Sequence, residues 1–201
     1  MFRIYNFKFI CFFLSAACFS FLLQTSIAWP KMAGDIKVVC DKWPDGSSVQ
    51  AFSEDAIRLM GAENDEEKAL AVFRFIHMWT SINDGHVPRE PALGDNYIDD
   101  PLKVLNVYGA HHCDGLTRIM EYAWRSLGSR AEKLYRSGHT QADVFYQDQD
   151  GVGRWHLFDL SQGVFVYNRS GGHIATADEL ASDFSLIFRP SIGPKPGKQI
   201  G

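Results

Sequence analysis

The chain has 201 residues, of which 46% are hydrophobic and 13% aromatic, and its formal charge at pH 7 is −4. A chain of this length and composition can bury one sizeable core, so we expect a single domain. It contains no basic block, which argues against nucleic acid and anionic membrane surfaces as partners.

The N-terminal segment, residues 1–28, has the pattern of a cleavable secretory signal. Arg3 and Lys8 give it a positive start, an apolar run covers 9–23, and Ser26–Ala28 supplies the small residues of a cleavage site. An uncleaved anchor is the alternative, but this apolar run is shorter than the roughly 20 residues that a spanning helix needs. We therefore expect a secreted or periplasmic protein without stable membrane insertion, whose charge after cleavage is −6 because two basic residues and no acid are removed.

We expect four segments: the signal peptide 1–28, an irregular N-terminal extension 29–63, a folded domain 64–187 and a linker-like tail 188–201. The first helix is expected to begin after Asn64 and to end near Ser81. Acidic residues fill its first turn, where the helix dipole favours them, and large apolar residues recur at helical spacing. Three prolines and many turn-forming residues then predict a long loop over 83–101, and such loops are often functional.

A second helix is expected to begin near Cys113, with an apolar stripe along it and Gly128 just beyond its end. Strand patterns follow at Ala131–Tyr135, Thr140–Gln147, Arg154–Leu160 and Val164–Tyr167. A capping box from Thr176 to Glu179 predicts a last short helix. Helices followed by a hairpin-rich antiparallel sheet indicate an α+β fold.

Three polar residues stand at the ends of these predicted elements. Cys113 begins a helix, where unpaired backbone N–H groups and the helix dipole favour a thiolate. His139 begins one strand and Asp159 ends the next, so an antiparallel hairpin makes them neighbours. If the helix packs across this sheet, the three side chains become nucleophile, base and orienting acid.

The ordered motifs resemble the transglutaminase-like superfamily of papain-type thiol enzymes. They are a cysteine at a helix start, "LG" closing that helix, "GH" opening a strand and then "WHLFD", and the similarity spans roughly Asp65 to Tyr167. The run "DEEKALAVFRFI" also resembles the helix that precedes the core in many bacterial members. The resemblance implies a papain-like core with Cys113 as nucleophile, His139 as base and Asp159 as the residue that orients the base. Gln141 stands where many members carry an aromatic residue, and Asp143 where glutamate is frequent.

The sequence leaves several other roles open for Cys113. It could be an inert buried thiol or could form a disulfide with Cys40. A zinc site with His111, His112 and either His139 or His156 is a further possibility, although adjacent ligands cannot all point at one ion from a regular helix. His156 is expected to make a structural hydrogen bond, and His111 and His112 either tune the thiolate or lie exposed in a loop.

The resulting hypothesis is a thiol-dependent acyl-transfer enzyme that acts on a protein or peptide substrate. Thiolate attack on a peptide or carboxamide carbonyl would give a thioester, and hydrolysis is favoured over crosslinking. The backbone N–H of Cys113 and a group from Tyr108 or Asn106 are candidate oxyanion donors. No cofactor or metal is implied. The alternative is a non-catalytic module of the same fold that binds protein or cell-wall material, since the superfamily includes crosslinkers, peptidases, amidases and inactive scaffolds.

Overall fold

The computed structural model of the protein describes residues 41–82, 89–90 and 96–188, all within one compact unit. The predicted signal peptide, the start of the extension, most of the predicted loop and nearly all of the tail lie outside the described residues. In the described part, no helix has the length and apolar character needed to cross a membrane.

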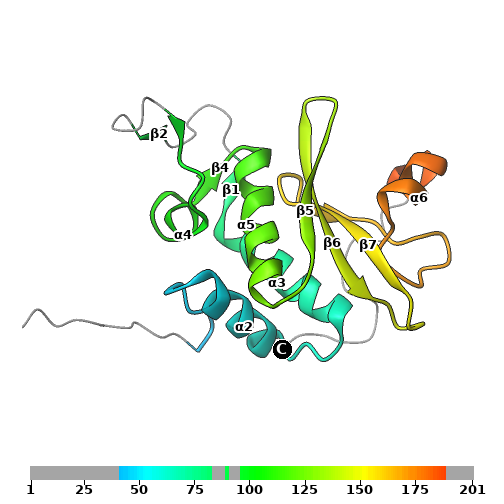
Figure 1. The fold of residues 1–201 in the computed structure, drawn as a ribbon, viewed down its shortest axis with the longest axis horizontal. Coiled ribbons are helices and arrows are strands. Elements are labelled where there is room, and N and C mark those ends of the chain that lie inside the picture. Colours follow the sequence, from blue (N-terminus) through cyan, green and yellow to red (C-terminus); the bar gives the residue numbers. More distant parts are fainter. Residues whose placement is uncertain (1–40, 83–88, 91–95, 189–201) are drawn as a thin grey trace, which may run out of the picture. The chain divides into compact units, whose positions relative to one another are not determined.

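The chain mixes helices and short strands (Figure 1). The helices are α2 Val49–Met60, α3 Asp65–Trp79, α4 Pro101–Lys103, the π-helix η2 Val104–Tyr108, α5 Cys113–Ser126, α6 Ala177–Ser182 and the 3₁₀-helix η3 Phe184–Phe188. The strands are β1 Ser81–Ile82, β2 Arg89–Glu90, β3 Asn96–Tyr97, β4 Ala110–His111, β5 Ala131–Arg136, β6 His139–Gln147, β7 Gly153–Asp159 and β8 Val164–Phe165. This composition agrees with the predicted α+β class.

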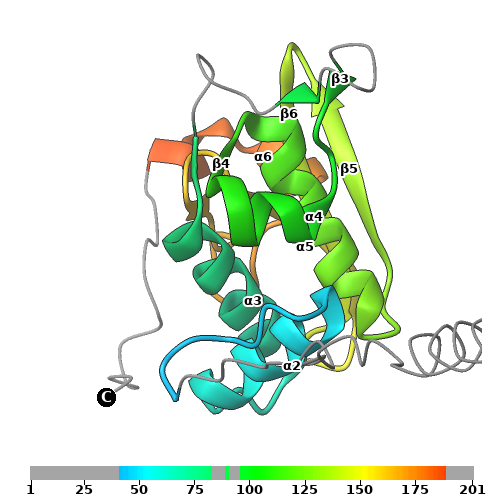
Figure 2. The same ribbon diagram turned by 90° about the vertical axis from the view of Figure 1, so that its left-hand side faces the viewer.

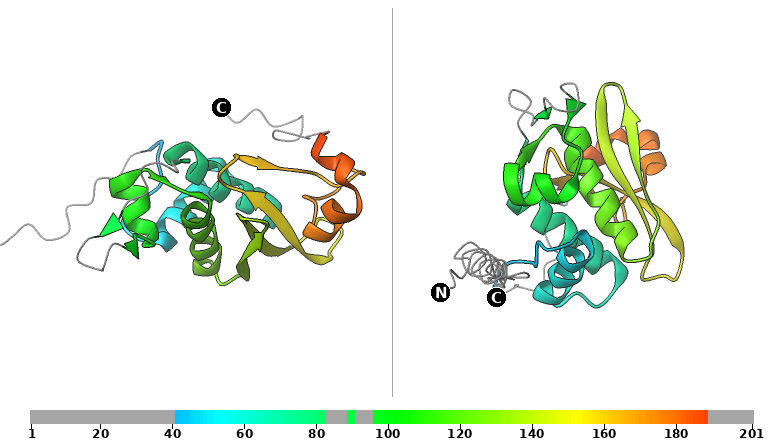
Figure 3. Two further views of the ribbon diagram at one scale, coloured as in Figure 1. Left: turned by 90° about the horizontal axis from the view of Figure 1, so that it is seen from above. Right: turned by 60° about the vertical axis from the view of Figure 1, so that its left-hand side comes forward.

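The main sheet has the order β5-β6-β7-β8, and every neighbouring pair in it is antiparallel. Two small strand pairs lie outside it, the parallel pair β1–β4 and the antiparallel pair β2–β3. Helices α3 and α5 pack on one side of the main sheet, and α6 lies on the other side (Figure 3). Helix α2 packs on α3 and α5 (Figure 2).

The core lies between α3, α5 and the sheet. Trp124 of α5 meets Tyr146 of β6, with ring centroids 6.1 Å apart, and its indole N–H donates to the backbone oxygen of Phe145 at 3.0 Å. Alternate residues of β6 are buried toward the helices, namely Thr140, Ala142, Val144 and Tyr146. The intervening side chains, beginning with His139, therefore point to the other face of the sheet.

The prediction that 29–63 is irregular is wrong for Val49–Met60, which is helix α2. Its N-cap Ser48 accepts a hydrogen bond from the backbone N–H of Ala51, and Gly61 ends it in the left-handed conformation. Its buried apolar face, which includes Phe52 and Ala56, packs into the core. The turn-forming residues before Ser48 favoured the prediction of an irregular segment, although a capped amphipathic helix follows them.

Candidate active site

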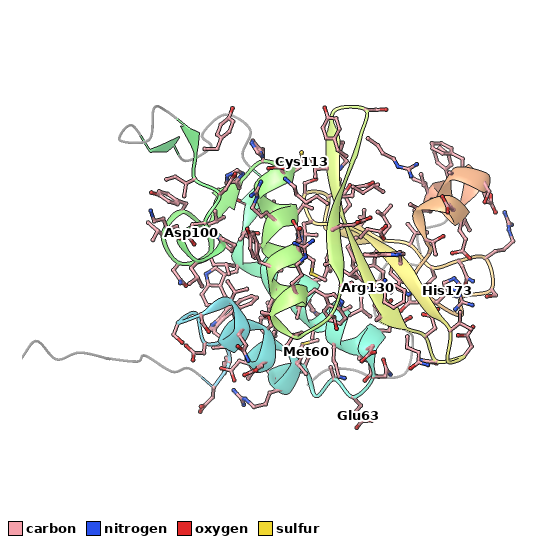
Figure 4. The ribbon with its side chains drawn as sticks, viewed as in Figure 1. Met60, Glu63, Asp100, Cys113, Arg130 and His173 are labelled. Carbon is pink, nitrogen blue, oxygen red and sulfur yellow. The ribbon has the colours of Figure 1, made fainter. Side chains whose placement is uncertain are left out.

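Cys113 is the first residue of α5, as predicted, and His112 is the N-cap residue. The sulfur is a free thiol on a partly exposed residue. The first N–H groups of an α-helix have no partner within the helix, so they and the dipole stabilise negative charge at this place. Figure 4 shows Cys113 at the end of α5 that lies beside the β5–β6 hairpin.

Two hydrogen bonds define the level of Cys113 along β6. One turn after Cys113, the hydroxyl of Thr117 donates to the backbone oxygen of Thr140 at 3.1 Å, and near its other end α5 bonds to Phe145. Helix and strand therefore advance in the same direction. One helical turn back from Thr117 is about 6 Å, or about two strand residues. That distance brings Cys113 to about the level of the β5–β6 turn, immediately before His139, where β6 begins.

His139 follows a two-residue turn between β5 and β6. Ser137 and Gly138 both have positive φ, 49° and 83°, which is the signature of a type I′ turn. Arg136 pairs with His139 across this turn. The imidazole is thereby fixed to the first position of the strand, as the "GH" motif predicted.

His139 and Asp159 are in direct contact, 2.6 Å from Nε2 to Oδ2. Ala142 pairs with Phe158 in the ladder, and the same register continued by one residue brings position 159 to the end of β6 that holds His139. The Asp159 side chain is buried, whereas that of His139 is about one-third exposed. Because a carboxylate can only accept, Nε2 carries the proton of this bond. Among the described residues, Nδ1 has no hydrogen-bond partner, so it is left for another group.

Asp159 is held as an anion by the turn that follows β7. Ser161 donates its hydroxyl and Gln162 its backbone N–H to Oδ1, at 2.7 and 3.0 Å. Burial alone would raise the pKa of Asp159, but hydrogen bonds from His139, Gln162 and Ser161 outweigh it and hold that pKa below its ordinary value. An ionised Asp159 can stabilise a protonated His139.

His111 is completely buried, which corrects the view of it as a possible exposed loop residue. Its Nδ1 accepts the backbone N–H of His112 at 3.0 Å, so Nε2 carries the proton and donates to the oxygen of Ile98 at 3.1 Å. Burial, followed by the charge of His112, lowers the pKa of His111. The ring lies against the backbone of Gly115, where a Cβ would overlap with it. His111 is thus a neutral, buried side chain that packs against the first turn of α5.

Asp114 ties the same helical turn to β5. Lys133 Nζ lies 2.5 Å from its Oδ1, and Arg118 lies 3.7 Å from Oδ2. Burial would raise the pKa of Asp114, but the bond and charge of Lys133 and the charge of Arg118 lower it. The turn that carries Cys113 is therefore fixed on two sides, by His111 and by Lys133.

Two of the remaining predicted donors and ligands have structural partners. His156 is buried and donates from Nδ1 to the oxygen of Ile174 at 2.6 Å, which confirms its structural hydrogen bond. Asn106 donates one N–H of its amide to the oxygen of Gly46 at 2.8 Å, which holds this side chain to the loop before α2. Within the described residues, no three His, Cys, Asp or Glu side chains are placed to hold a metal ion.

The structure brings together two of the three predicted site residues. Asp159 contacts His139, and Cys113 begins the helix whose first turn lies at the same end of the sheet. Cys113 and His139 make no hydrogen bond with one another in this structure, and Cys40 lies outside the described residues. Catalytic hydrogen bonds are often long before substrate binds, so this separation is compatible with a thiol–imidazole pair.

Neither a protein-family model nor a curated protein matches the chain. Among solved structures, it is similar to a crystal structure of a TGase, with a TM-score of 0.41 and 16% sequence identity. This likeness covers 74% of the present chain and only 37% of that one.

Proposed function

We propose that the protein is a thiol-dependent acyl-transfer enzyme with Cys113 as nucleophile, His139 as base and Asp159 as the acid that orients the base. The observation that carries this proposal is the 2.6 Å contact between His139 Nε2 and Asp159 Oδ2. It assigns the ring proton to Nε2 and leaves Nδ1 as the basic atom, at the end of the sheet where α5 begins with Cys113. This is the order of roles that a cysteine–histidine–carboxylate site needs.

The reaction proceeds in two halves. The Cys113 thiolate attacks the carbonyl carbon of a peptide or carboxamide bond, and the N–H groups at the start of α5 stabilise the oxyanion. The His139 imidazolium then gives its proton to the leaving amine as the C–N bond breaks, which leaves a thioester. In the second half, His139 takes a proton from water, the resulting hydroxide attacks the thioester, and the C–S bond breaks to release the thiolate and a carboxylic acid, which loses its proton to the solvent, while His139 is again protonated.

We further propose a protein or peptide substrate, hydrolysis in preference to crosslinking, and export after cleavage behind Ala28. N-terminal sequencing of the exported protein should begin at Trp29. Intact Met1 in a membrane fraction would contradict export by cleavage.

The test of the nucleophile is alkylation of Cys113 by iodoacetamide at pH 6, measured by mass spectrometry of its peptide. A free cysteine has a pKa of about 8.5, so less than about 1% of it is thiolate at this pH, whereas a thiolate paired with imidazolium forms at a much lower pH. Cys113 should therefore react much faster than a model thiol. His139→Ala should abolish this advantage and Asp159→Ala should weaken it.

Each alternative for the sulfur gives a different result. A disulfide blocks labelling until reductant is added, and a zinc site blocks it until a chelator is added. An inert buried thiol labels slowly, and unfolding rather than His139→Ala changes its rate. Fast labelling that survives His139→Ala would mean that another cation, with His112 the first suspect, activates the thiol.

The second candidate is a non-catalytic binding module of the same fold. The absence of a Cys113–His139 hydrogen bond among the described residues favours it. It predicts a thiol with ordinary reactivity at pH 6 and binding of a protein or cell-wall ligand that Cys113→Ala leaves unchanged.

A further inference from the structure

Gln141 lies two residues after His139 on β6, so the two side chains point to the same face of the sheet. Continued by one residue, the β6–β7 register places Gln141 directly opposite Asp159. Its Nε2 is 3.2 Å from Asp159 Oδ2, the oxygen that His139 also contacts. One carboxylate oxygen therefore has two donors, one from the imidazole and one from an amide.

The orientation of the Gln141 amide follows from the chemistry of its neighbour. An ionised carboxylate only accepts hydrogen bonds, so the NH₂ end of the amide must face Asp159 and its oxygen must face away. A hydrogen bond to an ionised acceptor is stronger than one between neutral groups. The direction of the Gln141 amide is therefore defined.

Each of the two carboxylate oxygens of Asp159 accepts its own set of hydrogen bonds. Ser161 and Gln162 hold Oδ1 from the turn after β7, whereas Gln141 and His139 hold Oδ2 from β6. A carboxylate held at one oxygen can still rotate about that anchor. His139 keeps the proton on Nε2 while Nδ1 gains and loses one, so its bond to Oδ2 alternates between charged and neutral, whereas the amide of Gln141 is a donor at Oδ2 that does not change.

We infer that Gln141 is a positioning residue of the site: its amide N–H fixes Oδ2 of Asp159, and Asp159 in turn fixes the His139 ring with its proton on Nε2. This inference rests on the proposed function. The position is the one where an aromatic residue is frequent in the resembling superfamily, so this chain uses a hydrogen bond there in place of a ring.

The test compares Gln141→Met, which keeps the shape but removes the donor, with Gln141→Glu. The introduced carboxyl is anionic at neutral pH and repels Asp159, but once protonated it can donate an O–H in place of the lost N–H. Its pKa is raised by the neighbouring anion above the usual 4.3 or so, so protonation begins below about pH 6. The matched controls are Gln147→Met and Gln147→Glu, because Gln147 lies on the same strand and the same face, but among the described residues its side chain bonds only to the backbone oxygen of Gly151.

Two readouts are measured between pH 5 and 8: the alkylation rate of Cys113 relative to wild type, and the ¹⁵N shifts of the His139 ring, which report its tautomer. Gln141→Met should slow alkylation by about fivefold at every pH, the effect of one hydrogen bond. Gln141→Glu should be slower than Gln141→Met at pH 7.5 and should recover toward wild type at pH 5. The wild-type ring should hold its proton on Nε2 when neutral, and Gln141→Met should give a mixture of tautomers.

The outcomes separate the inference from the proposed function. If wild-type alkylation does not depend on His139, the proposed role of His139 as base fails, and the ¹⁵N shifts alone then decide the role of Gln141. If both Gln141 variants keep the wild-type tautomer and pH profile, Gln141 has no positioning role, whatever the thiol does. A loss in Gln141→Glu that does not recover at low pH also overturns the inference, as does an equal loss in the Gln147 variants.

Discussion

Gly115→Ala should destabilise the protein, although the same change in most helices is stabilising. Alanine is favoured over glycine by about 1 kcal/mol in a helix interior. Here the new Cβ would overlap with the His111 ring, which is fully buried and held by its bonds to Ile98 and His112. Overpacking of this kind costs about 1–3 kcal/mol, and each broken hydrogen bond about 1 kcal/mol. We expect a net loss of about 2 kcal/mol in the free energy of unfolding.

The assay is urea denaturation followed by circular dichroism, combined with alkylation of Cys113 at pH 6. The control is a double-mutant cycle with His111→Ala, because removal of the ring makes room for the Cβ. In the His111→Ala background, Gly115→Ala should be neutral or stabilising, which gives a coupling energy within the range of about 0.5–3 kcal/mol for residues in contact. If Gly115→Ala stabilises the wild-type chain, the close packing of His111 on α5 is refuted.

Three further changes test other parts of the structure. Asp143 is buried, one of its oxygens has no hydrogen-bond partner among the described residues, and burial followed by the charge of Glu132 raises its pKa to about 6. The folded state therefore binds more protons than the unfolded state between pH 4 and 6, so stability falls as pH rises through that window. Asp143→Asn should be more stable than wild type at pH 7, by at most about 3 kcal/mol, but not at pH 4, as urea titrations at both pH values will show. Tyr146→Phe should be neutral or stabilising in thermal denaturation, because the buried hydroxyl of Tyr146 has no partner among the described residues. Tyr167→Phe should instead cost about 1 kcal/mol of stability, because it removes the 3.2 Å hydrogen bond to Glu66. Equal effects of the two substitutions would contradict this difference. Ser137→Gly should stabilise the β5–β6 turn by a few tenths of a kcal/mol, because the positive φ at this position suits glycine; a loss of stability in urea would show that the turn differs.

The order of elements and the contact between His139 and Asp159 could be predicted from the sequence because both depend on local rules. A two-residue turn ending in Gly138 sets where β6 begins, and the antiparallel ladder then determines which residue of β7 comes back to that point. Strand alternation adds that both side chains share a face. Nothing beyond hairpin geometry was needed to bring this pair together.

The surroundings of the pair depend on contacts that no local pattern specifies. The burial of His111 results from its approach to Gly115, and only the packing of β4 against α5 creates it. The sequence shows that Gln141 replaces the aromatic residue found in many members of the resembling superfamily. Its hydrogen bond to Asp159 could not be predicted, because that requires knowing which residues of β6 and β7 pair with one another. Helix α2 was missed because turn-forming residues precede Ser48, although the cap itself and the spacing of Phe52 and Ala56 were signals that could have found it.

The alternation of side chains between the two faces of β6 limits how Cys113 can reach His139. Thr140 faces α5 through the buried side of the sheet, so the neighbouring His139 projects from the opposite side of β6. A sulfur on α5 can therefore meet the ring only around the start of the strand, and His139 is the first residue of that strand. Because Asp159 occupies Nε2, the approach must be to Nδ1. A histidine one strand residue further along would face the core, as Thr140 does, whereas at the first position after the turn it faces the side of the sheet on which Asp159 lies.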